Sequence, residues 1–126
     1  MKQILIIIIA TMISFLGISQ NGKMAANVQG LKIAYITKEL NLTSDEAQKF
    51  WPVYYTYFNE LKKARIETKD DVIVFEEKML GIKKKYSSEF KKVLGTDERA
   101  NKVFLADRNF GAIIRKEIQN RQKNLR

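Results

Sequence analysis

The sequence contains no histidine and no cysteine, and it has a single proline and a single tryptophan among its 126 residues. Without histidine and cysteine the chain has no thiol nucleophile, no disulfide and no Ser-His-Asp triad. It also lacks the imidazole and thiolate ligands of most zinc, copper and haem sites. We therefore expect no enzyme activity, no cofactor and no metal site.

The chain has an excess of positive charge. The chain has 23 Lys and Arg against 14 Asp and Glu, a net charge of +9. A basic protein of this size ordinarily suggests nucleic acid as a partner, so the compartment in which it works matters.

The N-terminus predicts export. A short positive start precedes an apolar run from Ile4 to Ile18, and polar residues follow at 20–23, which is the pattern of a secretory signal peptide. Gly17 and Ser19 place small residues at the −3 and −1 positions, so we expect cleavage between Ser19 and Gln20. A retained anchor is the alternative, but the run is shorter than the ~18–20 residues that span a bilayer.

The predicted organisation is therefore a signal peptide at residues 1–19 and one domain at residues 20–126. Export makes nucleic acid a poor partner. Residues 20–61 carry no net charge, whereas residues 62–126 hold 18 bases and 10 acids. All of the positive excess thus lies in the second half of the chain.

Proline and glycine are sparse after residue 30, which favours long helices. The apolar spacing predicts a helix from about Met24 to Leu40, with Asn41 taking the left-handed conformation that ends it. A second helix begins at a capping box formed by Thr43 and Glu46 and runs to about Glu67. We expect a bend at Pro52 within it; a helix that starts at Pro52 is the alternative.

A third helix is predicted from about Asp70 to Val93, where apolar residues follow a nearly heptad spacing. Gly81 within it marks a soft point or a close approach of another helix. Gly95 then ends this helix, and Thr96 caps a fourth helix with a basic end. The predicted fold class is all-α, with four long helices in an extended hairpin-like bundle.

Six aromatic residues occur within nine positions of the second predicted helix, and they cover most of its circumference. Core packing accounts for Phe50, Trp51, Tyr54 and Phe58. Tyr55 and Tyr57 are left for solvent, a second layer of packing or a partner. Asp107 lies on or beside the apolar stripe of the fourth helix, and we expect it to pair with an Arg or Lys of a neighbouring helix.

Basic residues recur in short clusters between residues 83 and 126. Each cluster alone suits a solvated helix face. Together, next to apolar residues, they can attract acidic polypeptide segments or anionic membrane surfaces. The candidate polypeptide-binding residues are Tyr55, Tyr57, Lys83, Lys84, Lys91, Lys92, Arg115 and Lys116.

Residues 33–54, IAYITKELNLTSDEAQKFWPVY, resemble the Spy/CpxP family of envelope proteins, which is named for an LTxxQ motif, and in particular its branch labelled sensors of extracytoplasmic-function sigma factors. Here the motif spans Leu42, Thr43 and Glu46, with Glu in place of Gln. A second, related motif at residues 94–99 carries an extra Gly before Thr96 and has Arg99 where the family has Gln.

The resemblance implies a periplasmic location, a cradle-shaped helical homodimer and ATP-independent binding of non-native polypeptides during envelope stress. Other members restrain a membrane signalling partner. We therefore expect a protein that binds unfolded or partner polypeptides and can contact the membrane surface; a regulator that docks on a membrane anti-sigma factor is the alternative.

Overall fold

The computed structural model describes residues 19–126, and all of its regular structure there is helical. The helices are α2 (Ser19–Leu40), α3 (Ser44–Glu67), α4 (Val72–Leu94) and α5 (Asp97–Asn124). The all-α class predicted from the sequence is confirmed. The predicted signal peptide lies outside the described residues, apart from Ser19. Residues 35–126 form one compact unit, and the chain before Tyr35 belongs to another.

Helix α2 begins before the predicted Met24 and ends where predicted. Asn41 has φ 50°, the left-handed conformation expected of it. Within the compact unit, Ile36 and Leu40 are buried and the ring of Tyr35 lies 5.7 Å from that of Phe110. The last two turns of α2 are thereby packed against α5.

The predicted capping box opens α3. The Thr43 side chain accepts from the Glu46 backbone N–H and the Glu46 carboxylate accepts from the Thr43 N–H, both at 3.2 Å. The helix continues through Pro52, so the alternative of a helix that starts there is wrong. The Thr56 hydroxyl donates to the Pro52 carbonyl at 3.0 Å, one turn beyond the proline.

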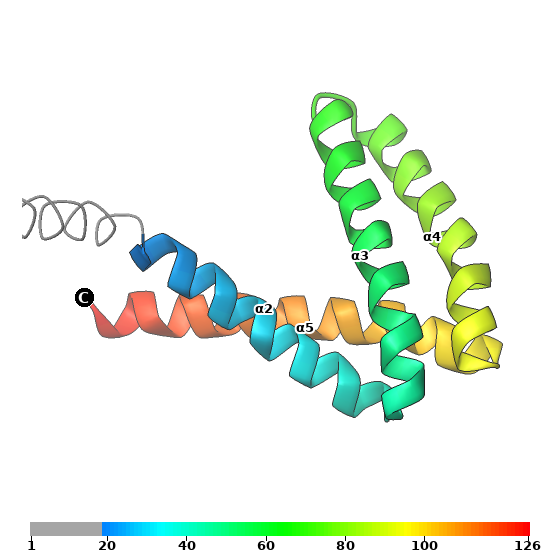
Figure 1. The fold of residues 1–126 in the computed structure, drawn as a ribbon. Coiled ribbons are helices and arrows are strands. Elements are labelled where there is room, and N and C mark those ends of the chain that lie inside the picture. Colours follow the sequence, from blue (N-terminus) through cyan, green and yellow to red (C-terminus); the bar gives the residue numbers. More distant parts are fainter. Residues whose placement is uncertain (1–18) are drawn as a thin grey trace, which may run out of the picture. The chain divides into compact units, whose positions relative to one another are not determined.

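Helices α3 and α4 form an antiparallel hairpin joined by residues 68–71 (Figure 1). Asp71 caps α4 by accepting from the Val74 N–H at 3.1 Å. Gly81 is exposed, and a Cβ added there would meet nothing within 4 Å. No neighbouring helix in the described part of the chain approaches Gly81, so close approach does not explain the glycine.

In the turn between α4 and α5, one helix ends and the next begins at the predicted residues. Gly95 has φ 90° and its N–H donates to the Lys91 carbonyl at 2.7 Å, which ends α4. The Thr96 side chain accepts from the Arg99 N–H at 3.2 Å and caps α5. Helix α5 then leaves the open end of the α3–α4 hairpin and runs across it (Figure 1).

The core lies at the open end of the hairpin, where α3, α4 and α5 meet the last turns of α2. Aromatic rings dominate it: Phe50, Tyr57 and Phe90 are almost fully buried, and Phe50 and Phe90 lie 5.4 Å apart. Small residues of α5, Ala100, Val103 and Ala106, allow close packing against these rings.

Candidate functional site

A pocket of about 390 Å³ lies among α3, α4 and α5, and all three helices line it. Its apolar walls come from Leu61 of α3, Met79 of α4, and Phe104 and Leu105 of α5. We call it the α3–α4–α5 pocket. A volume of this size, part apolar and part polar, is typical of sites that bind small molecules or single side chains of a partner.

Four cations line the pocket: Arg65, Lys83, Arg108 and Arg115. The only acid in the lining is Asp107. Among the residues that the structure describes, no hydrogen bond or ion pair engages any of these four cationic groups. The pocket therefore holds positive charge that none of the described residues pairs with.

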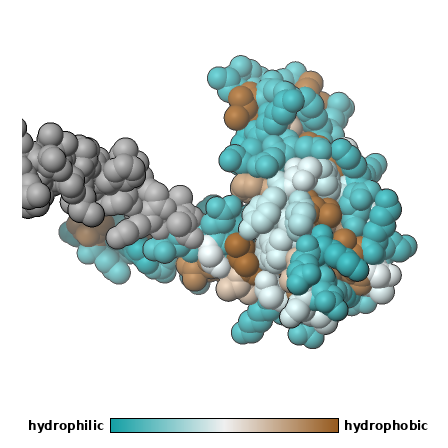
Figure 2. All heavy atoms as spheres, in the orientation of Figure 1, coloured by the Kyte–Doolittle hydropathy of each residue, from teal (hydrophilic) through white to brown (hydrophobic). Residues whose placement is uncertain are grey.

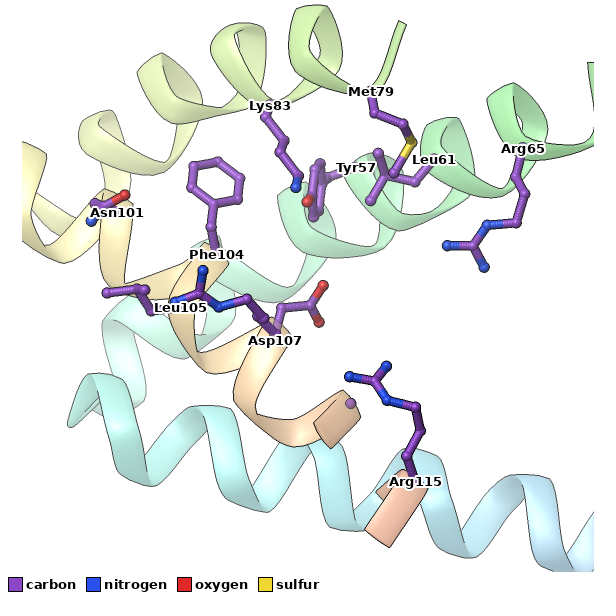
Figure 3. A pocket seen from close by; sticks show the side chains of 12 residues that line it. Tyr57, Leu61, Arg65, Met79, Lys83, Asn101, Phe104, Leu105, Asp107 and Arg115 are labelled. Carbon is purple, nitrogen blue, oxygen red and sulfur yellow. The ribbon is translucent and has the colours of Figure 1, made fainter. Parts of the chain in front are cut away.

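The charged side chains turn into the pocket from different helices. Arg65 reaches down from α3 and Arg115 reaches up from α5, toward the space beside Asp107 (Figure 3). Lys83 extends from α4 toward the ring of Tyr57 (Figure 3). A single bound group can consequently be approached by cations from three helices at once.

Tyr57 forms part of the pocket floor. Its side chain is only 1% exposed, and its ring lies 5.4–5.7 Å from those of Tyr86, Phe90 and Phe104. Of the three surroundings predicted for Tyr57, a second layer of packing is the one found and solvent is excluded, because α4 and α5 both pack on its side of α3. Its hydroxyl lines the pocket and is hydrogen-bonded to none of the described residues.

The Tyr57 hydroxyl stays protonated. Burial, followed by the nearby negative charge of Asp107, raises the pKa of Tyr57 above its ordinary value of 10.0. A neutral hydroxyl without an internal acceptor can donate a hydrogen bond to a ligand. Tyr57 thus adds a directional donor to the four cations.

Asp107 is held by Tyr54, whose hydroxyl donates to the Asp107 carboxylate at 2.6 Å. Burial first, and then the charge of Asp107, raise the pKa of Tyr54 far above its ordinary value. The sequence predicted an Arg or Lys as the partner of Asp107. A buried tyrosine of α3 takes part in holding this carboxylate at the pocket wall.

Three of the predicted binding residues meet at the pocket: Tyr57, Lys83 and Arg115. The other five lie outside it. Tyr55 is 37% exposed on α3, and Lys84 and Lys116 are exposed beside their pocket neighbours. Lys91 pairs with Asp97 and Lys92 pairs with Glu89, each at 3.0 Å, so both lysines already have acidic partners.

Sequence reasoning missed Arg65, Arg108 and the apolar lining. The spacing of these residues in the sequence could have indicated them. On α3, Tyr57, Leu61 and Arg65 follow at four-residue intervals, and on α5, Arg108 and Arg115 are seven apart. Such spacing places side chains in rows along one helix face. Rows of this kind, rather than runs of adjacent lysines, mark the pocket.

The two capping motifs meet through Arg99. Its guanidinium forms an ion pair with the Glu46 carboxylate and donates to the carbonyls of Leu40 at 2.9 Å and Leu94 at 3.1 Å. Leu42 packs against the core beside this cluster. The C-terminal ends of α2 and α4 are thereby tied to the N-terminal turn of α3, so Arg99 and the capping residues serve the fold.

Within residues 19–126, no group of three or more acidic side chains is placed to hold a metal ion, and no helix is long and apolar enough to cross a membrane. Comparisons with family models, curated proteins and solved structures find no match for this chain.

Proposed function

We propose that this chain is an exported, non-enzymatic protein that binds non-native or partner polypeptides in the cell envelope without nucleotide. The observation that carries this proposal is the α3–α4–α5 pocket, where four cations and a hydroxyl that pair with none of the described residues adjoin apolar walls. The signal peptide predicted at residues 1–19 supports the envelope setting.

The chemistry of the pocket favours an acidic segment with a neighbouring apolar residue. Arg65 and Arg115 can each form a two-point contact with a carboxylate, which a lysine cannot. Leu61 and Phe104 offer apolar surface beside them. Long-range attraction brings an acidic chain to the pocket, and apolar contact together with the Tyr57 hydroxyl retains it.

An unfolded protein exposes such mixed segments and a folded one largely does not, since folding buries the apolar residue. A pocket open to solvent and only large enough for one or two side chains gives weak, reversible binding at each encounter. That behaviour suits a holding chaperone, which must release its client without an energy source.

A regulator that docks on one membrane partner is the second candidate. It is favoured because the candidate site is limited to one pocket. Other basic residues, such as Lys91 and Lys92, already form ion pairs with acids of the same chain. A single pocket can bind one defined acidic segment selectively.

The experiment compares two charge-reversed variants of residues 20–126. Lys83→Glu with Arg115→Glu alters the pocket. Lys84→Glu with Lys116→Glu makes the same change in net charge at adjacent exposed positions. We expect the pocket variant to lose most of its suppression of aggregation for several unrelated unfolding proteins, and the adjacent variant to retain it at low salt.

Equal loss in both variants would show that overall charge, and not the pocket, holds polypeptides. No suppression by the unaltered chain with any client would overturn the chaperone reading. Isolation of a single membrane protein, bound by the unaltered chain but not by the pocket variant, would then establish the regulator.

A further inference from the structure

The lining of the α3–α4–α5 pocket carries a net charge of +3, because four cations face the single carboxylate of Asp107. The Tyr54 hydroxyl already donates a hydrogen bond to that carboxylate at 2.6 Å. A carboxylate ligand brings one negative charge to the pocket, whereas a phosphate monoester brings about −1.5 to −2 at pH 7. The excess of positive charge therefore favours the phosphate.

The donors of the pocket come from three helices. Arg65 of α3 and Arg115 of α5 reach in from two sides, and Lys83 of α4 extends toward the ring of Tyr57 (Figure 3). A carboxylate has two oxygens in one plane, whereas a phosphoryl group has three terminal oxygens that point in different directions. Donors that converge from three helices can each meet a separate phosphoryl oxygen.

The Tyr57 hydroxyl is a buried donor in the same pocket. The side chain is 1% exposed, and its hydroxyl is hydrogen-bonded to none of the described residues. Buried polar groups in native proteins nearly always have a hydrogen-bond partner. An acceptor oxygen of a ligand in the pocket would supply that partner.

The apolar walls limit what the phosphate is attached to. Leu61, Met79, Phe104 and Leu105 line a pocket of about 390 Å³, near the lower end of the ~300–1,000 Å³ of ordinary ligand sites. On the face of the molecule drawn in Figure 2, hydrophobic residues form small patches among hydrophilic ones. A short apolar group suits these surroundings better than a sugar, whose hydroxyls would lose water against the apolar walls.

We propose that the α3–α4–α5 pocket binds a phosphate monoester that carries a short apolar group. Phosphoryl oxygens accept from Arg65, Arg115 and the Tyr57 hydroxyl, and the apolar group lies against Leu61 and Phe104. The cations are exposed, so the ligand can enter from solvent and its affinity should fall as salt rises. No polypeptide takes part in this binding, so it is independent of the function proposed above.

The experiment titrates the protein with hexyl phosphate by isothermal titration calorimetry. We expect one ligand per chain, with Kd below about 1 mM in about 150 mM salt. Methyl phosphate has the same charged group with almost no apolar part. Hexyl sulfate has the same chain and three terminal oxygens but only one charge. Each should bind at least about tenfold more weakly than hexyl phosphate.

Removal of two guanidinium groups tests the charged part of the site. We expect Arg65→Gln with Arg115→Gln to lower the affinity for hexyl phosphate at least about tenfold. Lys84→Gln with Lys116→Gln removes the same charge at exposed positions beside the pocket. This control should change the affinity by less than about twofold. Equal losses in the two variants would show that overall charge attracts the ligand, which would overturn the proposal.

Gly111 permits a test that leaves every charge in place. It lines the pocket, and a Cβ added there would lie 3.6 Å from Nη1 of Arg115, an ordinary contact distance. Gly111→Leu should fill pocket space and weaken hexyl phosphate binding at least about tenfold, while α5 stays folded because leucine is the better helix former. Gly81→Leu is the matched control, since Gly81 lies outside the pocket and a Cβ there would meet nothing within 4 Å. Equal affinities of the two leucine variants would overturn the proposal.

Two further ligands identify the source of the phosphate and test a carboxylate in its place. Phosphatidylcholine vesicles with hexadecyl phosphate present the same group in a bilayer. Cosedimentation with these vesicles, but not with plain ones, would assign the ligand to a lipid, and binding of free hexyl phosphate alone would assign it to a soluble ester. Heptanoate that binds as tightly as hexyl phosphate would overturn the proposal, as would hexyl phosphate that does not bind. Intact suppression of aggregation beside failed phosphate binding would leave the proposed function in place.

Discussion

Tyr55 and Tyr57 lie two positions apart on α3 and have very different surroundings. Tyr55 contacts Trp51 and Tyr54 at the surface and is 37% exposed, whereas Tyr57 lies among three aromatic rings of α4 and α5. The aromatic run alone did not show this, because it surrounds most of the helix. The packing of α4 and α5 decides which of these aromatic side chains is covered by both helices.

Alanine substitutions separate the two tyrosines. We expect Tyr57→Ala to lower the free energy of unfolding by about 3–5 kcal/mol, because it leaves a cavity in the aromatic core. Tyr55→Ala should lower it by less than about 1 kcal/mol, since much of the ring is in solvent. Chemical denaturation of both variants gives the two values, and similar values would contradict the packing described here.

Removal of single hydroxyls tests the hydrogen bond between Tyr54 and Asp107. Tyr54→Phe should destabilise the chain by about 1–2 kcal/mol, because a hydrogen bond to an ionised acceptor is lost. Tyr57→Phe is the matched control: its hydroxyl bonds none of the described residues, so stability should change by less than about 0.5 kcal/mol. Tyr57→Phe should instead weaken polypeptide binding, as measured by fluorescence titration.

At the scale of the helices, the local capping signals were sufficient to predict where elements begin and end. Thr43 with Glu46, Asn41, Gly95 and Thr96 all have the predicted roles, since each depends on neighbours within a few residues. Long-range partners were not predictable in this way. Arg99 joins the ends of α2 and α4, which are more than fifty residues apart in sequence.

The pair between Glu46 and Arg99 makes stability depend on pH. The Arg99 guanidinium, followed by the hydrogen bond from the Thr43 backbone, lowers the pKa of Glu46 below its ordinary value of 4.5. A lowered folded-state pKa means that the contribution of Glu46 is complete above the ordinary value. It is lost as pH falls through the lowered value.

We expect Glu46→Gln to lower the melting temperature near pH 7 and to make less difference near pH 3. Glutamine can still accept from the Thr43 N–H, so the capping box is kept while the charge is removed. Thermal melts by circular dichroism across this pH range measure the effect. Some acid sensitivity should remain, because the Tyr86 hydroxyl, and then Lys85, lower the pKa of Glu60. An equal deficit at both pH values would contradict the ion-pair explanation.

For the whole molecule, the pocket illustrates what a sequence can and cannot indicate. The excess of positive charge after residue 62 was visible, and Lys83 and Arg115 were among its predicted carriers. The convergence of cations from three helices at one pocket was not, because residues of α3, α4 and α5 meet only through tertiary packing.

Burial also divides the compact unit into a stable end and a labile end. Buried side chains concentrate in residues 50–64, 86–94 and 100–110, whereas residues 69–74 and 115–126 are exposed throughout. Opening of an exposed helix end breaks backbone hydrogen bonds without uncovering core rings, so it requires less free energy than global unfolding.

Native-state hydrogen exchange should therefore show a gradient along the chain. We expect the slowest amides around Phe90 and Val103, with protection approaching that of global unfolding, and exchange at least about a hundredfold faster beyond Arg115 and at the hairpin tip. Uniform protection along α5 would contradict the gradient.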